Sequence, residues 1–273
     1  MFARQNIKIV LLAYFIMNKN LKNSLIILTA FFLYYSLLKG YFFSTKELIA
    51  SIEPGYLRLL CFQLICFIPI GLALLLLYKP KDIFKSIGLG KSPLLGFGIA
   101  LLCTLPMIVG SAAIGTINKD ITLNKILGSM VYAGFFEEVV FRGFLFGLLF
   151  RYNRWGFIPA VLVGAFMFGA GHLYQGNDMV SALASFGVTA LGAVWFSWIY
   201  VEWNYNLWVA IAMHILMNAS WILFSISTTA AGDVASNIIR GVTIAAIIVA
   251  TILYKRRKGL PYLINKHTLW VNS

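Results

Sequence analysis

Eight apolar segments separated by short polar loops account for most of the 273-residue chain. Each is close to the roughly 20 residues that a helix needs to cross the hydrocarbon core of a membrane. Helices satisfy their own backbone hydrogen bonds inside a bilayer, which makes them the natural structure for such segments. The sequence therefore predicts an all-α fold, a polytopic transmembrane helix bundle of about eight spans. The segments are Ser24–Phe43, Leu59–Tyr78, Leu94–Ile114, Ile126–Phe150, Trp155–Gly171, Met179–Tyr200, Leu207–Ile226 and Ile238–Tyr254.

The composition supports this interpretation and excludes several classes of protein. Hydrophobic residues make up 60% of the chain and charged residues only 11%, whereas soluble domains average about 25% charged residues. These values exclude a soluble globular enzyme and a disordered chain. The net charge of +13 does not indicate nucleic-acid binding, because lysine and arginine are not interleaved with aromatic residues on a polar face. Membrane lipids are the expected surroundings, with no nucleic-acid partner.

The positive charges instead indicate how the chain is oriented. Cytoplasmic loops of membrane proteins carry an excess of lysine and arginine. With the N-terminus inside, fifteen basic residues fall on the inner side and six on the outer side. We therefore expect an integral, multi-pass protein of a bacterial plasma membrane with both termini in the cytoplasm. The inner residues are Arg4, Lys8, Lys19, Lys22, Lys79, Lys81, Lys85, Lys91, Arg151, Arg154, Lys255, Arg256, Arg257, Lys258 and Lys266; the outer ones are Lys39, Lys46, Arg58, Lys119, Lys125 and Arg240.

A single bundle covers most of the chain, and no second domain is expected. Residues 24–254 form the predicted transmembrane domain. A basic N-terminal segment, residues 1–23, precedes it, and a basic cytoplasmic tail, residues 255–273, follows it. Residues 1–16 are interpreted as an upstream extension or a peripheral segment, because the sequence from Met17 resembles a natural start, with a basic stretch before an apolar run.

Three charged residues stand where a membrane span should be apolar. The fourth segment places Glu137, Glu138 and Arg142 near its middle, where each ionised side chain costs roughly 2.5–3.5 kcal/mol on the insertion scale. Glu138 and Arg142 are four residues apart in the favoured order for an ion pair on a helix. Glu137 is rotated by about 100° from Glu138, which leaves it free for chemistry. The alternative is a buried three-residue salt-bridge cluster without chemistry.

Further polar residues occur in two other apolar segments. His172 ends the fifth segment, and His214 lies in the seventh with Asn218 four residues later, hence on the same helix face. Two histidines and an asparagine beside a glutamate pair indicate a site inside the bundle. The loop assignment puts Glu137 and His214 near mid-depth but His172 near the outer end of its segment. Either the fifth segment begins earlier, or irregular backbone after His172 re-enters the bundle, which is tolerated where it lines a wet cavity.

These residues form three motifs that resemble those of a known family. Glu137-Glu138-x-x-x-Arg142, Phe168-x-x-x-His172 and His214-x-x-x-Asn218 are similar to the motifs of the CPBP family. That family contains the type II CAAX prenyl proteases and the bacteriocin-processing or bacteriocin-immunity proteins, and it is also called the Abi family of intramembrane proteases. The resemblance covers about residues 80–226, which would be the protease core, and it implies a CAAX-protease-like bundle.

The resemblance also implies roles for the six residues. Glu137 would be the general base that activates a water molecule, and His172 would help to orient and polarise that water. His214 and Asn218 would donate hydrogen bonds to the oxyanion that develops on the scissile carbonyl. Glu138 and Arg142 would maintain the geometry of the site. General chemistry agrees, since peptide hydrolysis needs a base within reach of water and donors directed at the oxyanion.

Whether a metal takes part is a separate question. Glu137, His172 and His214 would make a two-histidine, one-carboxylate zinc set with an open position, and the family is sometimes described as metalloproteases. Their spacing differs from that of a zincin helix, and Asn218 is an unusual zinc ligand. We therefore favour a metal-independent glutamate protease without a cofactor, with zinc as the alternative.

The leading hypothesis is an intramembrane endopeptidase. Its substrates would be membrane-associated or lipidated peptides, either CAAX-type proteins or leader, pheromone or bacteriocin peptides. One alternative is a bacteriocin-immunity or scaffold protein that binds without cleaving, although such a protein need not keep all four residues of the proposed chemistry. Another is a proton-coupled transporter, since buried glutamate, arginine and histidine also suit proton relays; the absence of repeat symmetry between the two halves of the chain argues against it.

Overall fold

The computed structural model describes residues 2–41 and 45–272 of the chain, and the side chains of residues 19–41 and 46–272. Over these residues the predicted all-α fold is confirmed, with a single isolated bridge between Trp155 and Val271 as the only extended pairing. The α-helices are α1 (Phe2–Lys39), α2 (Thr45–Leu48), α3 (Gly55–Leu77), α4 (Ile83–Ser86), α5 (Pro93–Ile114), α6 (Leu123–Lys125), α7 (Ala133–Glu137), α8 (Gly147–Tyr152), α9 (Phe157–Ala170), α10 (Met179–Glu202), α11 (Leu207–Leu223) and α12 (Val234–Lys258). Two 3₁₀ turns, η1 (Pro80–Asp82) and η4 (Leu173–Gln175), and two π-helical stretches, η2 (Ile126–Tyr132) and η3 (Glu138–Phe146), complete the set.

Six helices in the described part of the chain are long and apolar enough to cross a membrane. They are the second half of α1 from Lys19, α3, α5, α9 with its η4 extension, α10 and α12. The other two predicted spans are present in different forms. Helix α11 is apolar but has only 17 residues, and the fourth segment is a continuous helical rod in which α6, η2, α7, η3 and α8 follow one another. The protein is thus an integral, multi-pass membrane protein.

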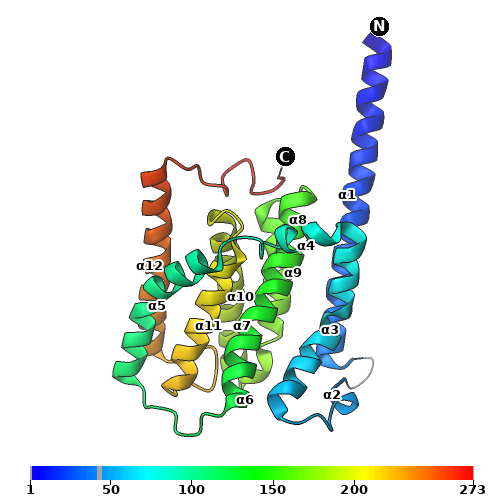
Figure 1. Cartoon of the computed structure of the whole chain (residues 1–273). Helices are drawn as coiled ribbons and strands as arrows, with labels where there is room; N and C mark the ends of the chain where they lie inside the picture. Colours follow the sequence, from blue (N-terminus) through cyan, green and yellow to red (C-terminus); the bar gives the residue numbers. More distant parts are fainter. Residues whose placement is uncertain (1, 42–44, 273) are drawn as a thin grey trace.

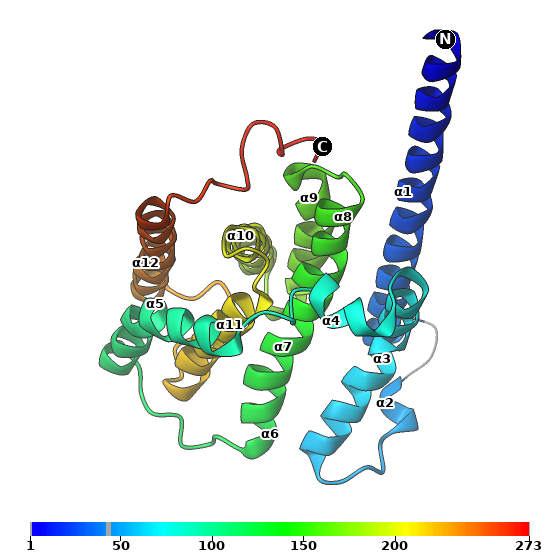
Figure 2. The same cartoon turned by 45° about the horizontal axis from the view of Figure 1, so that its top comes forward.

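The rod lies in the middle of the bundle (Figures 1 and 2). Helix α11 packs on one side of it, and α5 and then α12 lie beyond α11 on that side, while α1 and α3 lie on the other. Helix α9 returns antiparallel to the rod and packs against α10. Because helices surround η3, all nine of its residues are buried. The two chain ends lie at the same end of the bundle (Figure 1), as an even number of crossings requires.

The predicted N-terminal segment and the first span lie in one helix. Helix α1 continues without a break through residues 23 and 24, and its apolar span starts at Lys19. The first half of α1 projects beyond the other helices (Figure 1). That residues 1–16 are an upstream extension or a peripheral segment stays a prediction, and Met1 lies outside the described residues.

The predicted tail is more ordered than a solvated basic segment. Helix α12 continues to Lys258 and ends at Gly259, whose φ of +62° suits a glycine at a helix C-terminus. Lys255 is buried and forms an ion pair with Glu202. Beyond Gly259 the chain crosses the start of α9, where the amides of Gly156, Phe157 and Ile158 donate to the carbonyls of Trp270, Thr268 and Leu269 at 2.8–3.1 Å. These bonds satisfy amides that a helix start leaves unpaired.

Two long helices begin with reciprocal caps at the opposite end of the bundle. Asp178 accepts the amide of Ser181 at the start of α10, and Asp233 accepts the amide of Ser236 at the start of α12. These serines also hydrogen-bond back to the aspartates, and their hydrogen bonds hold the pKa of both carboxyl groups below the ordinary value. The caps define where α10 and α12 begin after the loops at that end.

Candidate active site

The predicted ion pair within the fourth segment is present and fully buried. Arg142 donates to Oε1 of Glu138 at 3.0 Å, and the two side chains are 1% and 0% exposed. Glu138 is the first residue of the π-helical stretch η3, a kind of helix distortion that is frequent at functional sites. The four-residue spacing seen in the sequence therefore produces the expected contact.

Two aromatic rings enclose the Arg142 guanidinium. The ring of Phe168 on α9 lies 4.7 Å from the guanidinium carbon, and the ring of Phe196 on α10 lies 5.2 Å from it. Such cation–π contacts are stronger where water is excluded. They help to offset the cost of burying the charge and bring α9 and α10 to the ion pair. Phe168 was part of a predicted motif, whereas no pattern in the sequence marked Phe196.

His214 joins the ion pair from α11. Its Nδ1 lies 2.7 Å from Oε1 of Glu138, so the proton on Nδ1 points at the carboxylate and Nε2 faces the other way. Helix α11 can approach this closely because the rod has a glycine at Gly134, where a Cβ atom would lie 2.6 Å from the side chain of Ile215. The site thus depends on a close helix–helix contact one residue from His214.

Glu137 is the accessible carboxylate of this cluster. Its side chain is 30% exposed, against 0% for Glu138. Its Oε2 lies 3.8 Å from Nε2 of His214, so the imidazole connects the buried carboxylate to the accessible one. The adjacent glutamates therefore occupy different environments, as their rotation around the helix predicts.

His172 lies just beyond the end of α9. Helix α9 and the rod run antiparallel; Gly164 packs near Leu145, and the rings of Phe168 and Phe141 are 5.0 Å apart. This register directs the end of α9 toward the part of the rod that carries Glu137. Helix α9 has only 14 residues and ends at Ala170, and the 3₁₀ turn η4 follows His172.

The imidazole of His172 is oriented by its own helix. Its Nδ1 lies 2.7 Å from the carbonyl oxygen of Phe168, which can only accept, so Nδ1 carries the proton and Nε2 has a free lone pair. From α1, Lys39 donates to the Gly171 carbonyl at 3.4 Å. These contacts fix the turn that carries His172 beside the end of α1.

Asn218 is held by a different partner from the other predicted residues. Its side-chain amide donates to the carbonyl oxygen of Ser129 in η2 at 3.0 Å. The end of α11 is fixed by Asn118, which donates to the Ile222 carbonyl at 3.0 Å. The direct contacts therefore join Glu137, Glu138, Arg142 and His214. Among the described residues, no hydrogen bond or ion pair links His172 or Asn218 to these four; His172 connects through the Phe168 ring, and Asn218 through α11. Neither Ser129 nor Asn118 stood out in the sequence.

Part of the hydrogen-bonding capacity of the buried pair is unused. Oε2 of Glu138 and two nitrogens of Arg142, Nε and Nη2, are buried without a hydrogen-bond partner among the described residues. Unpaired buried polar atoms are costly and are uncommon in native structures. The cluster therefore combines the accessible carboxylate of Glu137 with buried, unused hydrogen-bonding atoms on Glu138 and Arg142.

Among the described side chains, no group of three or more histidine, cysteine, aspartate or glutamate residues is placed to hold a metal ion. Nδ1 of His214 lies against the Glu138 carboxylate and Nδ1 of His172 against the Phe168 carbonyl, which leaves Nε2 of each ring free. Metal-binding histidines are commonly oriented by such contacts. The metal-independent mechanism and the zinc alternative therefore both stay hypotheses.

The helices of this membrane bundle enclose a cluster of two carboxylates, a histidine and an arginine. The protein is therefore a multi-pass membrane protein with a polar site inside its bundle. A comparison with known families gives one match. Residues 120–220 match the model of the Rce1-like family, described as type II CAAX prenyl endopeptidase Rce1-like. Over these residues the chain is similar to that family.

The matched segment contains all six predicted site residues and is shorter than the core of about residues 80–226 expected from the motifs. It leaves out α1, α3, α5 and α12. No curated protein and no solved structure matches the chain. The similarity to a family of proteases is thus limited to the matched residues.

Proposed function

We propose that the protein is an intramembrane endopeptidase in which Glu137 activates the attacking water. The observation that carries this proposal is the contrast inside the cluster: Glu138 is sealed by Arg142 and His214, whereas Glu137 is accessible and faces Nε2 of His214. A carboxylate held beside a fixed imidazole, with room for water, is an arrangement suited to general-base catalysis.

The proposed reaction is the hydrolysis of a peptide bond. Glu137 takes a proton from water as the oxygen attacks the carbonyl carbon, and the carbonyl oxygen becomes an oxyanion. Nε2 of His172, which has a free lone pair, accepts the second hydrogen of that water and orients it. The carbon–nitrogen bond then breaks, and Glu137 returns the proton to the leaving amine.

Two donors are suited to stabilising the oxyanion. Asn218 uses one amide hydrogen on Ser129 and keeps the other available. His214, fixed through Nδ1, donates from Nε2 when the ring carries both protons. Loss of a single oxyanion donor typically lowers turnover about 10²–10³-fold. Glu138 and Arg142 position His214. We propose this chemistry without a metal, and zinc remains the alternative that the chelator experiment below tests.

The proposed substrates are membrane-associated or lipidated peptides, CAAX-type proteins or leader, pheromone and bacteriocin peptides. The site lies among helices that would be embedded in a membrane, so a substrate held in the bilayer reaches it by lateral diffusion. We also propose a bacterial plasma membrane with both termini cytoplasmic. The location of both termini at one end (Figure 1) and the excess of basic residues predicted for that side support this orientation.

The test is Glu137→Gln, which removes the base and keeps the shape of the side chain. The protein is reconstituted in vesicles with membrane peptides, and the products are identified by mass spectrometry. We expect cleavage to fall at least 100-fold, in line with the usual contribution of a general base, with unchanged thermal unfolding. Glu47→Gln, at an exposed glutamate of α2, is the matched control and should cleave normally.

Two results would contradict this proposal. Undiminished cleavage by Glu137→Gln would remove Glu137 from the chemistry. A biological effect that survives when cleavage is abolished would favour an immunity or scaffold protein. A chelator arm tests the metal separately: activity should persist after treatment with a strong chelator, and a loss reversed by zinc would overturn the metal-free mechanism.

A further inference from the structure

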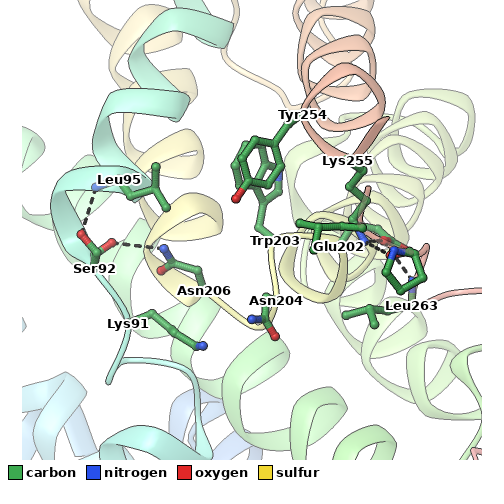
Figure 3. Close-up of a pocket in the computed structure, with 12 residues that line it drawn as sticks. Lys91, Ser92, Leu95, Glu202, Trp203, Asn204, Asn206, Tyr254, Lys255 and Leu263 are labelled. Atoms are coloured by element: carbon green, nitrogen blue, oxygen red, sulfur yellow. Dashed lines mark hydrogen bonds and ion pairs between the residues drawn. The ribbon is translucent and has the colours of Figure 1, made fainter. Parts of the chain in front are cut away.

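A second feature of interest is a cavity of about 390 Å³ at the end of the bundle that carries the termini (Figure 3). It lies where the start of α5, the turn from α10 to α11, the end of α12 and the chain after α12 meet. None of the six residues of the candidate active site lines it. The cavity is therefore a separate site.

One wall of this cavity is apolar. The rings of Trp203 and Tyr254 stack with their centroids 4.9 Å apart and an interplanar angle of 18°, and Leu95, Leu260 and Pro261 continue the surface. Leu95 and Leu260 are each nearly half exposed. Tryptophan and tyrosine are enriched where a membrane protein meets the lipid headgroups, so the wall has the composition expected at that depth.

Several polar residues that line the cavity are already fully paired. Glu202 accepts hydrogen bonds from Lys255 and from the amides of Leu263 and Ile264. Asn206 donates to the Ser92 carbonyl and accepts the amide of Trp208. These groups hold the walls together and have little capacity left for a ligand.

Three other polar groups are free to bind. The Lys91 ammonium, the Asn204 amide and the Tyr254 hydroxyl all line the cavity, and within the described part of the chain these side-chain groups make no hydrogen bond or ion pair. Figure 3 shows Lys91 and Asn204 together at one side and the Tyr254 hydroxyl apart from them, toward Leu95. Asn204 adopts a φ of +54°, a left-handed conformation that asparagine tolerates better than most residues. A cation with two further donors is a set that recognises a phosphate or carboxylate.

The surroundings strengthen the preference for an anion. Arg256, Arg257 and Lys258 follow the buried Lys255 on α12 and are exposed. The paired Glu202 and Lys255 cancel, which leaves Lys91 as the net charge among the lining residues. Basic pockets between transmembrane helices on the cytoplasmic side are sites where acidic phospholipid headgroups bind.

We infer that this cavity binds the headgroup of an acidic glycerophospholipid. Lys91 and Asn204 contact the phosphate and the Tyr254 hydroxyl contacts the glycerol part of the headgroup, while the start of the acyl chains lies along Leu95 and the Trp203 ring. A soluble phosphate would leave the apolar wall exposed to water, so the combined polar and apolar lining favours a lipid. This inference does not depend on the protease function.

The experiment measures lipid binding to the full-length protein after delipidation in detergent. Native mass spectrometry follows titration with phosphatidylglycerol, with phosphatidylcholine of the same acyl chains, and with glycerol phosphate. We expect Lys91→Gln to weaken phosphatidylglycerol binding about fivefold, the loss typical of one lysine near an anionic surface. Tyr254→Phe should weaken it about two- to threefold through one lost hydrogen bond.

The matched control is Lys81→Gln, at another exposed lysine between α3 and α5 that does not line the cavity. It should bind phosphatidylglycerol as the parent protein does. Equal losses in Lys81→Gln and Lys91→Gln would mean diffuse attraction to the basic surface and would overturn the inference. So would equal binding of phosphatidylcholine, or binding of glycerol phosphate as tight as that of the lipid.

Discussion

Two buried glutamate–cation pairs lie at different places in the bundle, and their surroundings differ. Glu202 and Lys255 are 0% and 3% exposed, and Glu138 and Arg142 are 0% and 1% exposed. Both carboxylate oxygens of Glu202 accept hydrogen bonds, and Lys255 also donates to the Pro261 carbonyl at 2.8 Å. In contrast, Oε2 of Glu138 and two Arg142 nitrogens have no partner among the described residues.

The difference separates an ion pair whose carboxylate is fully hydrogen-bonded from one whose carboxylate is only partly hydrogen-bonded. In the proposed function the first is structural and the second supports the chemistry. The fully paired Glu202 joins α10, α12 and the chain after α12, whose backbone in turn caps α9. The partly paired Glu138 directs His214 toward the accessible Glu137. A fully satisfied buried network rigidifies a fold. An incompletely satisfied one costs stability and is expected to persist where it contributes to function.

The largest effect on stability should come from Glu202→Ala. It leaves Lys255 buried without a counter-charge and removes the acceptor of two backbone amides, so we expect the free energy of unfolding to fall by about 3–5 kcal/mol. Denaturation in detergent measures this, and cleavage per folded molecule should hardly change. Adding Lys255→Met should recover part of the loss. An unchanged free energy of unfolding in Glu202→Ala would show that the Glu202–Lys255 pair does not stabilise the fold.

A smaller loss of stability and a larger loss of activity should follow from Glu138→Gln. The glutamine carbonyl still accepts from Arg142, so we expect a cost of about 1.5–3 kcal/mol, the range for a hydrogen bond to a charged group. Because the acceptor that orients Nδ1 of His214 loses its charge, cleavage by the folded protein should fall at least tenfold. Glu138→Gln should lower cleavage more than stability, whereas Glu202→Ala should lower stability more than cleavage. Full activity of Glu138→Gln would show that the two ion pairs are equivalent.

Much of the site was predictable because charge inside an apolar segment is rare. Glu137, Glu138 and Arg142 stood out because a charged side chain in a membrane span is costly in free energy. The four-residue spacing of Glu138 and Arg142 then predicted their ion pair. The helices themselves followed from segment length. These signals lie within single segments of the chain, where helical geometry translates spacing directly into position.

The features that sequence analysis missed depend on contacts between segments. The π-helical stretch η3, the early end of α9 at Ala170 and the ring of Phe196 over Arg142 arise from packing among helices distant in sequence. The contact of Phe168 with Phe141 likewise depends on the register between α9 and the rod. The burial of Lys255 was also missed, because its charge was counted with the basic tail and without its partner Glu202.

The smallest expected change tests whether the position of His214 beside Glu138 depends on the close contact between α11 and the rod. In Gly134→Ala the new Cβ would lie 2.6 Å from the Ile215 side chain and 3.0 Å from its backbone nitrogen. Overpacking of this kind costs about 1–3 kcal/mol and moves α11, and with it His214, away from Glu138. We expect cleavage to fall more than stability does.

Gly187→Ala in α10 is the matched control, since nothing lies within 4 Å of its added Cβ. Replacing a helix glycine by alanine without strain stabilises a protein by about 0.4–1 kcal/mol, so this variant should unfold at a slightly higher temperature and cleave normally. If both alanines behave alike, the approach of α11 at Gly134 does not position His214. If only Gly134→Ala loses activity, the geometry of the exposed Glu137 and its histidine is maintained by packing around Gly134 as well as by the buried ion pair.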